Sequence, residues 1–253
     1  MSFQLKGWDY TQSTANLRDA DDLSLLYAQR MVTAVAYVEN PRKVLMLGMG
    51  GGSISTYLGR FLPEAAIDTI EIDPGVIAAA KFYFGLRNSD RVRYLPGDGR
   101  VYLNRNHGPY DLIVVDAFHG GYIPFHLLTR EFYELVKQRL TPGGAAVFNI
   151  HDGTKLYVSA IVTLRAVFPT VHLYPSGEGE VAVVATPRPA PPREALAEHA
   201  AELQARYGFR FPLPGLLEAR LENIDVSQGV MLTDDFAPVN LYDAIRDRKR
   251  RKK

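Results

Sequence analysis

The chain has 253 residues, of which 47% are hydrophobic, and it contains no cysteine. This length is enough to bury the core of one doubly wound domain. The lack of cysteine excludes disulfides and thiolate metal sites and is typical of a cytoplasmic protein. The apolar runs are shorter than the roughly 18 residues that a membrane span needs, and the start MSFQLKGWDY lacks the apolar core of a signal peptide.

The net charge of +1 is unevenly distributed. Residues 246–253, RDRKRRKK, hold seven basic residues and one acidic residue, and the rest of the chain holds 22 basic and 27 acidic residues. We expect the end of the chain to be a disordered basic tail. The negative charge of the body makes nucleic acid an unfavourable main partner.

Strand and helix patterns alternate along the chain. Residues 1–20 form a short remnant with the length of a hairpin, and Asp21 or Asp22 is expected to cap a helix that runs to about Val38. The strands expected after it are 44–47, 66–72, 92–95, 110–115, 145–150, 171–174 and 181–185. The helices expected among them are 53–61, 74–84, 129–139, 156–167 and, behind a proline-rich linker at 187–192, 193–206. This order predicts one Rossmann-like α/β domain over 21–245, with a mostly parallel seven-stranded sheet and helices on both faces.

Residues 44–54, VLMLGMGGGSI, predict a nucleotide-binding turn. An apolar strand leads into Gly48, Gly50, Gly51 and Gly52, and a helix follows. Glycine is expected there because a Cβ would occupy the space of ligand atoms. The alternative is a tight strand-to-helix turn that binds no ligand.

Acidic residues follow the next three strands. Glu71 is expected to accept hydrogen bonds from a ribose diol, and Asp98, beside Gly99, from an adenine amino group. Asp73 has an alternative role as the N-cap of the next helix. Asp116 is expected nearest the reacting end of the ligand, and its alternative is to cap the loop that follows.

At this point the chain resembles a known family. The segments GMGGGSI, EIDPGVIAAAKFYF, DRVRYLPGDGRVYL, YDLIVVDAFHGGYIPFHLLTREFYELVKQRLTPGG and TDDFAPV are similar to the spermidine synthase (polyamine aminopropyltransferase) superfamily, above all its bacterial spermidine-synthase-like branch. The resemblance implies the Rossmann-like fold of S-adenosylmethionine methyltransferases. It also implies decarboxylated S-adenosylmethionine as donor, an amine such as a polyamine as acceptor, and a homodimer. We expect no metal.

The resemblance also implies roles for individual residues. Glu71 matches the ribose-binding acid, Asp98 the adenine-contacting acid, and Asp116 the first acid of an active-site DxxD segment. Gln12 stands at the position of a donor-contacting glutamine, and Tyr27 lies within about one residue of an active-site tyrosine.

Three features depart from the family pattern. Gly51 replaces an aspartate that holds the aminopropyl ammonium, His119 replaces the second DxxD acid, and the N-terminal β-domain is reduced to about twenty residues. Without the loop aspartate, intact S-adenosylmethionine is also admissible as donor, so methyl transfer remains an alternative. A nucleoside-binding regulator without catalysis is a second alternative.

The acceptor amine must lose a proton before it attacks. His119, with an ordinary pKa near 6.5, is a possible base, or else an exposed loop histidine. His126 and His151 are expected as loop or capping residues. Tyr122 and Phe125 are candidates for a wall of the acceptor pocket, whereas Phe132 and Tyr133 fit helix packing.

Overall fold

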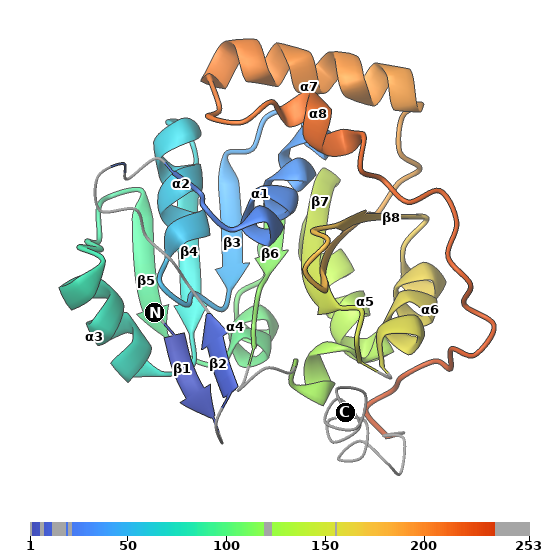
Figure 1. Ribbon diagram of the computed structural model, residues 1–253, viewed down its shortest axis with the longest axis horizontal. Coiled ribbons are helices and arrows are strands. Elements are labelled where there is room, and N and C mark those ends of the chain that lie inside the picture. The colour runs from blue at the N-terminus through green and yellow to red at the C-terminus, as the bar shows by residue number, and fades with distance from the viewer. Residues whose placement is uncertain are drawn as a thin grey trace.

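The computed structural model describes residues 2–5, 8–11, 19, 22–118, 123–154 and 156–235, and within them the chain forms a seven-stranded sheet and a separate two-stranded one (Figure 1). Gln12, His119, Tyr122 and the basic tail lie outside the described residues. The two-stranded sheet pairs β1 (Ser2–Leu5) with β2 (Trp8–Thr11) as an antiparallel hairpin.

The large sheet has the strand order β5-β4-β3-β6-β7-β9-β8. Its strands are β3 (Lys43–Leu47), β4 (Ala66–Glu71), β5 (Val92–Pro96), β6 (Tyr110–Val115), β7 (Leu140–His151), β8 (Thr170–Pro175) and β9 (Glu180–Thr186). The pairs among β3, β4, β5, β6 and β7 are parallel, whereas β9 runs antiparallel to both β7 and β8. The first residue of β9 therefore lies at the edge of the sheet where the parallel strands end.

Helices cover both faces of the sheet. They are α1 (Leu26–Val32), η1 (Thr33–Tyr37), α2 (Ser53–Phe61), α3 (Pro74–Tyr83), α4 (Gly99–Arg105), η2 (Phe125–Leu127), α5 (Arg130–Arg139), α6 (Tyr157–Val167), α7 (Arg193–Tyr207) and α8 (Leu213–Leu217). One core joins α1, η1, α2, α7 and α8 to one face, and a second joins α4, α5 and α6 to the other. The strand order and the two helical layers are those of the Rossmann-like methyltransferase fold, as the sequence predicts.

The strands explain why two layers are needed. Successive side chains of a strand point to opposite faces, and both sets are apolar: on β7, Val147 belongs to one core and Phe148 to the other. A strand with two apolar faces is stable only when helices cover both.

The first helix differs from its prediction. α1 begins at Leu26, four residues after Asp22, and its N-cap Leu25 makes no side-chain capping bond. The Asp22 carboxylate accepts a hydrogen bond from the Ser24 hydroxyl. After Val32 the chain tightens into the 3₁₀ helix η1 instead of continuing as α-helix.

Two further elements were not predicted or were predicted too short. α4 has seven residues, of which only Leu103 is buried, so it shows no helical periodicity. β7 begins at Leu140, because Leu140 pairs with Tyr110 ahead of a register shift. The proline-rich segment 187–192 leads into α7, whose buried residues join the same core as α1.

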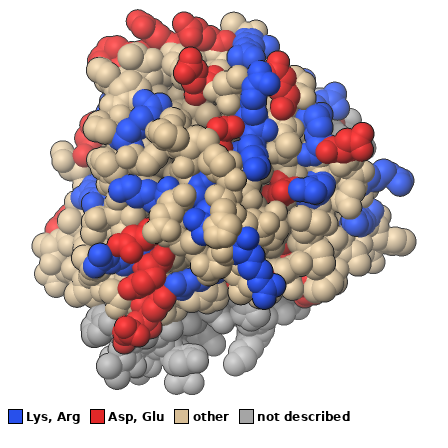
Figure 2. All heavy atoms as spheres, turned by 180° about the vertical axis from the view of Figure 1, so that it is seen from behind, with Lys and Arg blue, Asp and Glu red and all other residues tan. Residues whose placement is uncertain are grey.

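The exposed charges of the molecule are mixed. On the face seen from behind in Figure 1, basic and acidic side chains are interspersed among neutral ones (Figure 2). In the described part of the chain, no helix has the length and apolar character needed to cross a bilayer.

Candidate active site

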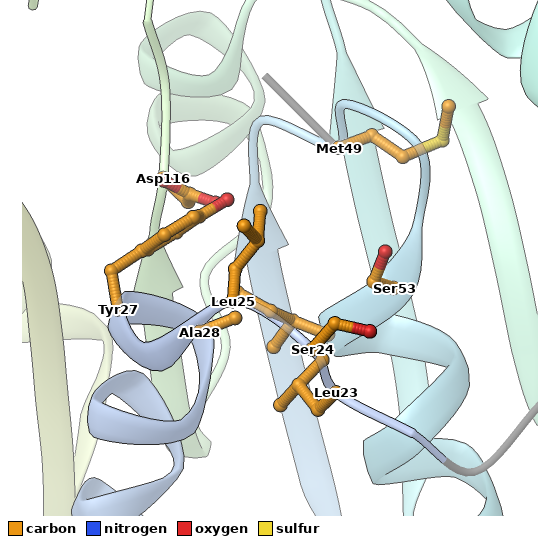
Figure 3. A pocket seen from close by; sticks show the side chains of 9 residues that line it. Leu23, Ser24, Leu25, Tyr27, Ala28, Met49, Ser53 and Asp116 are labelled. Carbon is orange, nitrogen blue, oxygen red and sulfur yellow. The ribbon is translucent and has the colours of Figure 1, made fainter. Parts of the chain in front are cut away.

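Asp116 follows the last residue of β6 and receives hydrogen bonds from two other elements. The side-chain amide of Asn149, on β7, donates to Asp116 Oδ1 at 2.9 Å. The side chain of Tyr27, on α1, points toward the same carboxyl group (Figure 3) and lowers its pKa as a hydrogen-bond donor. Three elements distant in sequence therefore converge on one acid.

The environment of Asp116 favours its neutral form more than water does. Burial raises the pKa of the Asp116 carboxyl to about 6, the hydrogen bonds from Asn149 and Tyr27 oppose this rise, and the carboxylates of Glu180 and Glu71 add to it. Burial, followed by the charge of Asp116, raises the pKa of Tyr27 well above its ordinary value. The tyrosine hydroxyl therefore stays protonated near neutral pH and acts as a donor.

A pocket opens between α1 and the glycine turn, with Asp116 in its wall (Figure 3). The ring of Tyr27 points toward Asp116, and Met49 and Ser53 lie across the pocket on the turn that leads into α2. Leu23, Leu25 and Ile54 supply apolar lining. The lining thus combines apolar residues with a few polar groups.

Two of the four glycines are required by the protein itself. Gly48 has φ +85°, and a Cβ there would lie 2.3 Å from the carbonyl oxygen of Asp116. Gly52 has φ +77°, and its Cβ would lie 2.2 Å from Leu86 Cδ2. The expectation that a Cβ would displace ligand atoms is therefore wrong at these two positions, where it would meet protein atoms. Gly50 also has a positive φ, of 52°.

Glu71 ties the glycine turn to the end of β4. Its Oε2 accepts from the backbone N–H of Met49 and its Oε1 from that of Asp73, both at 3.0 Å. The residue is only 8% exposed. Each carboxylate oxygen accepts two hydrogen bonds, so these contacts leave acceptor positions for a diol.

Asp73 and Asp98 both cap helices. Asp73 accepts from Gly75 N at 2.7 Å at the start of α3, which is the alternative role expected for it. Asp98 Oδ1 accepts from Val101 N at 2.8 Å at the start of α4. Its Oδ2 lies 3.9 Å from His126 Nε2. Asp98 thus has one oxygen on the helix and one directed toward η2.

A network of hydrogen bonds around Arg100 connects the region of Asp98 and His126 to the C-terminal part of the chain. The Arg100 guanidinium forms two hydrogen bonds with Asp234, at 2.8 and 2.5 Å, and a third with the carbonyl of His126 at 2.9 Å. The Thr129 hydroxyl also donates to Asp234, at 2.8 Å. Asp234 belongs to the TDDFAPV segment of the sequence, so the described start of this segment is held near Asp98 through Arg100.

The other residues considered in the sequence analysis and described by the structure take part in turns or in core packing. His151 is 7% exposed and its Nδ1 accepts from Gly153 N at 3.0 Å. Phe132 and Tyr133 are fully buried in the core on the α5 face, as expected for packing residues. Phe125 packs partly buried against the same core.

Sequence reasoning missed Asn149 and Glu180. Asn149 carried a signal, because it is the only polar residue of the expected strand 145–150. Glu180 could be assigned to this edge only once β9 was known to run antiparallel.

Comparisons with known proteins show the family of the chain. The family model for the spermine/spermidine synthase domain matches residues 26–174. The chain is 34% identical over 252 residues to the polyamine aminopropyltransferase of Vibrio vulnificus, an alignment that covers 95% of this chain and 83% of that protein.

Two solved structures have the same fold. Human methyltransferase-like protein 13 in complex with SAH matches with a TM-score of 0.66 and 25% identity, over 79% of this chain and 95% of that one. A spermidine synthase in complex with the transition-state analogue AdoDATO matches with a TM-score of 0.63 and 22% identity, over 86% and 80%. The fold and the pocket define a Rossmann-like transferase. The chain belongs to the spermine/spermidine synthase family.

Proposed function

We propose that the protein transfers an aminopropyl group from decarboxylated S-adenosylmethionine to an amine nitrogen of a polyamine. The observation that carries the proposal is the position of Asp116 in the pocket wall, with hydrogen bonds from Tyr27 and Asn149, next to the glycine turn. Membership of the spermine/spermidine synthase family and the name of the Vibrio relative support the choice of reaction.

In this proposal the donor lies along the carboxyl ends of β3, β4 and β5. Gly48, Gly50, Gly51 and Gly52 let the backbone approach the nucleoside, Glu71 accepts from the ribose hydroxyls, and Asp98 with Gly99 faces the adenine. Glu71 has the acceptor capacity and burial for this role. Gln12 as a donor contact and His119 as a base remain predictions.

The chemical step is an in-line displacement at a carbon bonded to a sulfonium. The lone pair of the acceptor nitrogen forms the new C–N bond, the C–S bond breaks, and its electron pair stays on sulfur, which leaves neutral methylthioadenosine. The proton lost by the attacking ammonium goes to a base such as the Asp116 carboxylate or water. The chief contribution of the protein is to hold nitrogen, carbon and sulfur in line.

Product analysis tests this proposal. The purified protein is incubated with decarboxylated S-adenosylmethionine and either 1,4-diaminobutane or spermidine. The expected products are methylthioadenosine and the amine lengthened by one aminopropyl unit, in equal amounts. Return of the donor unchanged, with nucleoside binding intact, would favour a regulator instead.

Methyl transfer is the second candidate, and Gly51 is the observation that favours it. An acid at this position would repel the carboxylate of intact S-adenosylmethionine, and Gly51 has no side chain to do so. The match to a human methyltransferase solved with SAH supports this alternative. Incubation with intact S-adenosylmethionine decides between them, since methyl transfer would release S-adenosylhomocysteine.

Two coarser features complete the proposal. The family resemblance supports a homodimer, which light scattering of the purified chain tests. The absence of cysteine supports a cytoplasmic location, which imaging of a tagged chain in cells tests.

A further inference from the structure

Three neighbouring strands present polar side chains on the same face of the sheet, under α1. On β6, β7 and β9 the residues that pack on the α1 side are, respectively, Leu112 and Val114, Ala145 and Val147, and Ala182 and Val184. Side chains two positions apart share a face. The same face therefore carries the next members of each series, Asp116, Asn149 and Glu180.

The strand register places Glu180 at the edge where the site lies. β9 is antiparallel to β7, and Glu180, its first residue, pairs with His151, the last residue of β7. Asn149 on β7 lies between β6, which ends at Asp116, and β9, which begins at Glu180. Neighbouring strands are about 5 Å apart, so Asp116 and Glu180 lie on opposite sides of β7, with Glu180 two residues beyond Ala182, which pairs with Asn149.

The turn before Glu180 is held in place. Asp152 N donates to the carbonyl of Gly179 at 2.8 Å, and Ser176 N donates to the carbonyl of Glu180 at 2.9 Å. Gly179 has φ +105°, and a Cβ there would lie 2.8 Å from His151 Cε1. The backbone of Glu180 is thus fixed against β7.

Asn149 adds an acceptor between the two acids. Its amide nitrogen faces Asp116 Oδ1, and its Oδ1 is buried without a hydrogen-bond partner in the described part of the chain. A buried acceptor without a partner is costly, and an ammonium group of a ligand would satisfy it.

We propose that Glu180 is an acceptor-binding residue, whose carboxylate pairs with the far ammonium of a diamine or polyamine while Asp116 orients the reacting nitrogen. This inference rests on the proposed function and adds a residue that selects, among acceptors, amines with a second ammonium group. Glu180 is an acid near Asp116 in a chain that has His119 at the position of the second DxxD acid.

Electrostatics supports this assignment. The Glu180 carboxylate raises the pKa of both Asp116 and Tyr27, which shows that its charge acts on both groups. An ammonium group placed between Asp116 and Glu180 is attracted by both carboxylates.

Calorimetry in the presence of saturating methylthioadenosine tests the inference. The probes are 1,4-diaminobutane and 1-aminobutane, and the proteins are the wild type, Glu180→Gln and the matched control Glu178→Gln, whose residue lies exposed on the same turn. We expect Glu180→Gln to weaken diamine binding about tenfold or more. It should leave 1-aminobutane and methylthioadenosine binding unchanged, and Glu178→Gln should behave as wild type.

The outcomes separate this inference from the proposed function. Equal diamine affinity in the wild type and Glu180→Gln, or no preference of the wild type for diamine over monoamine, overturns the role of Glu180, whatever the turnover assay gives. A diamine affinity that depends on Glu180, together with no release of methylthioadenosine from decarboxylated donor, overturns aminopropyl transfer and leaves the role of Glu180 standing.

Discussion

Asn149 and Asp116 are joined across the parallel strands β7 and β6 by a hydrogen bond of 2.9 Å from amide nitrogen to Oδ1. This contact helps to keep the pKa of Asp116 at about 6 in spite of its burial. An acid with this pKa is largely ionised at neutral pH and can accept a proton from an amine or bind its ammonium form.

The activity of the wild type should therefore depend on pH. We expect kcat/KM to fall as the pH drops below about 6, because protonated Asp116 neither attracts the ammonium nor accepts its proton. The Asn149→Leu variant removes a hydrogen-bond donor to the Asp116 carboxylate. The acid limb of the pH profile, where kcat/KM falls, should therefore shift to higher pH. An unchanged limb in Asn149→Leu would contradict the coupling.

Tyr27→Phe tests the second donor to Asp116. Loss of the hydroxyl removes a hydrogen bond that lowers the pKa of Asp116, so the acid limb should again move upward and the rate at pH 7 should fall about tenfold or more. Tyr83→Phe, at a residue that is 68% exposed on α3, is the control and should match the wild type. Identical pH profiles for the wild type and Tyr27→Phe would remove Tyr27 from the site.

Asp116→Asn should lower the activity and raise the stability of the fold at high pH. The pKa of Asp116 rises from 3.8 to about 6 on folding. The favourable contribution of the Asp116 carboxyl to the free energy of unfolding is therefore fully present below about pH 4 and is lost as the pH rises through 6. Two units correspond to about 3 kcal/mol, which is the most that Asp116→Asn should gain at pH 8. Urea denaturation should show this gain at pH 8 and little difference at pH 4. An equal gain at both pH values would rule out the ionisation of Asp116 as its cause.

Asp98 caps α4 and is proposed to face the adenine, and two variants separate these roles. Asparagine is a good N-cap, so Asp98→Asn should keep the stability within a few tenths of a kcal/mol, whereas Asp98→Ala should lose about 1 kcal/mol. Both should weaken methylthioadenosine binding by about 1–3 kcal/mol, because neither presents a carboxylate to the purine. Normal binding by Asp98→Asn would assign Asp98 to helix capping alone.

The Arg100–Asp234 contact should support the same corner of the site. Asp234→Asn weakens two charge-assisted hydrogen bonds, and we expect a loss of stability of about 1 kcal/mol, limited because the groups are partly exposed. The affinity for the nucleoside should fall as well. Arg100 also binds the carbonyl of His126, and His126 lies beside Asp98, the residue proposed to face the adenine. Asp235→Asn, at the exposed neighbouring acid, should change neither quantity.

The sequence predicted the parts of the fold that have strong local patterns. Strands such as β3 and β6 are continuous apolar runs that end in glycine or an acid, and their places were predicted to within a few residues. α4 was missed because it buries only Leu103. An acid before an apolar pattern is a capping signal and predicts a helix start at Asp21 or Asp22, but α1 begins at Leu26 and Asp22 binds Ser24 instead.

Only some of the site residues could be predicted from the sequence. Gly48, Glu71 and Asp116 follow their own strands, so a parallel sheet predicts that they share an edge. Asn149 follows the same rule, because β7 is parallel to β6. Glu180 joins them only through the insertion of β9 between β7 and β8. That order depends on tertiary packing and has no local signal in the chain.

In the proposed function, the carboxyl ends of β3, β4, β5 and β6 form a site for a sulfur-linked adenosine, with Asp116 at its reacting end. A crystal structure with methylthioadenosine tests it most directly. We predict the ribose hydroxyls within hydrogen-bond distance of Glu71, the adenine beside Asp98 and the sulfur on the Asp116 side of the pocket. A nucleoside bound elsewhere, or bound here with its sulfur directed away from Asp116, would contradict the account.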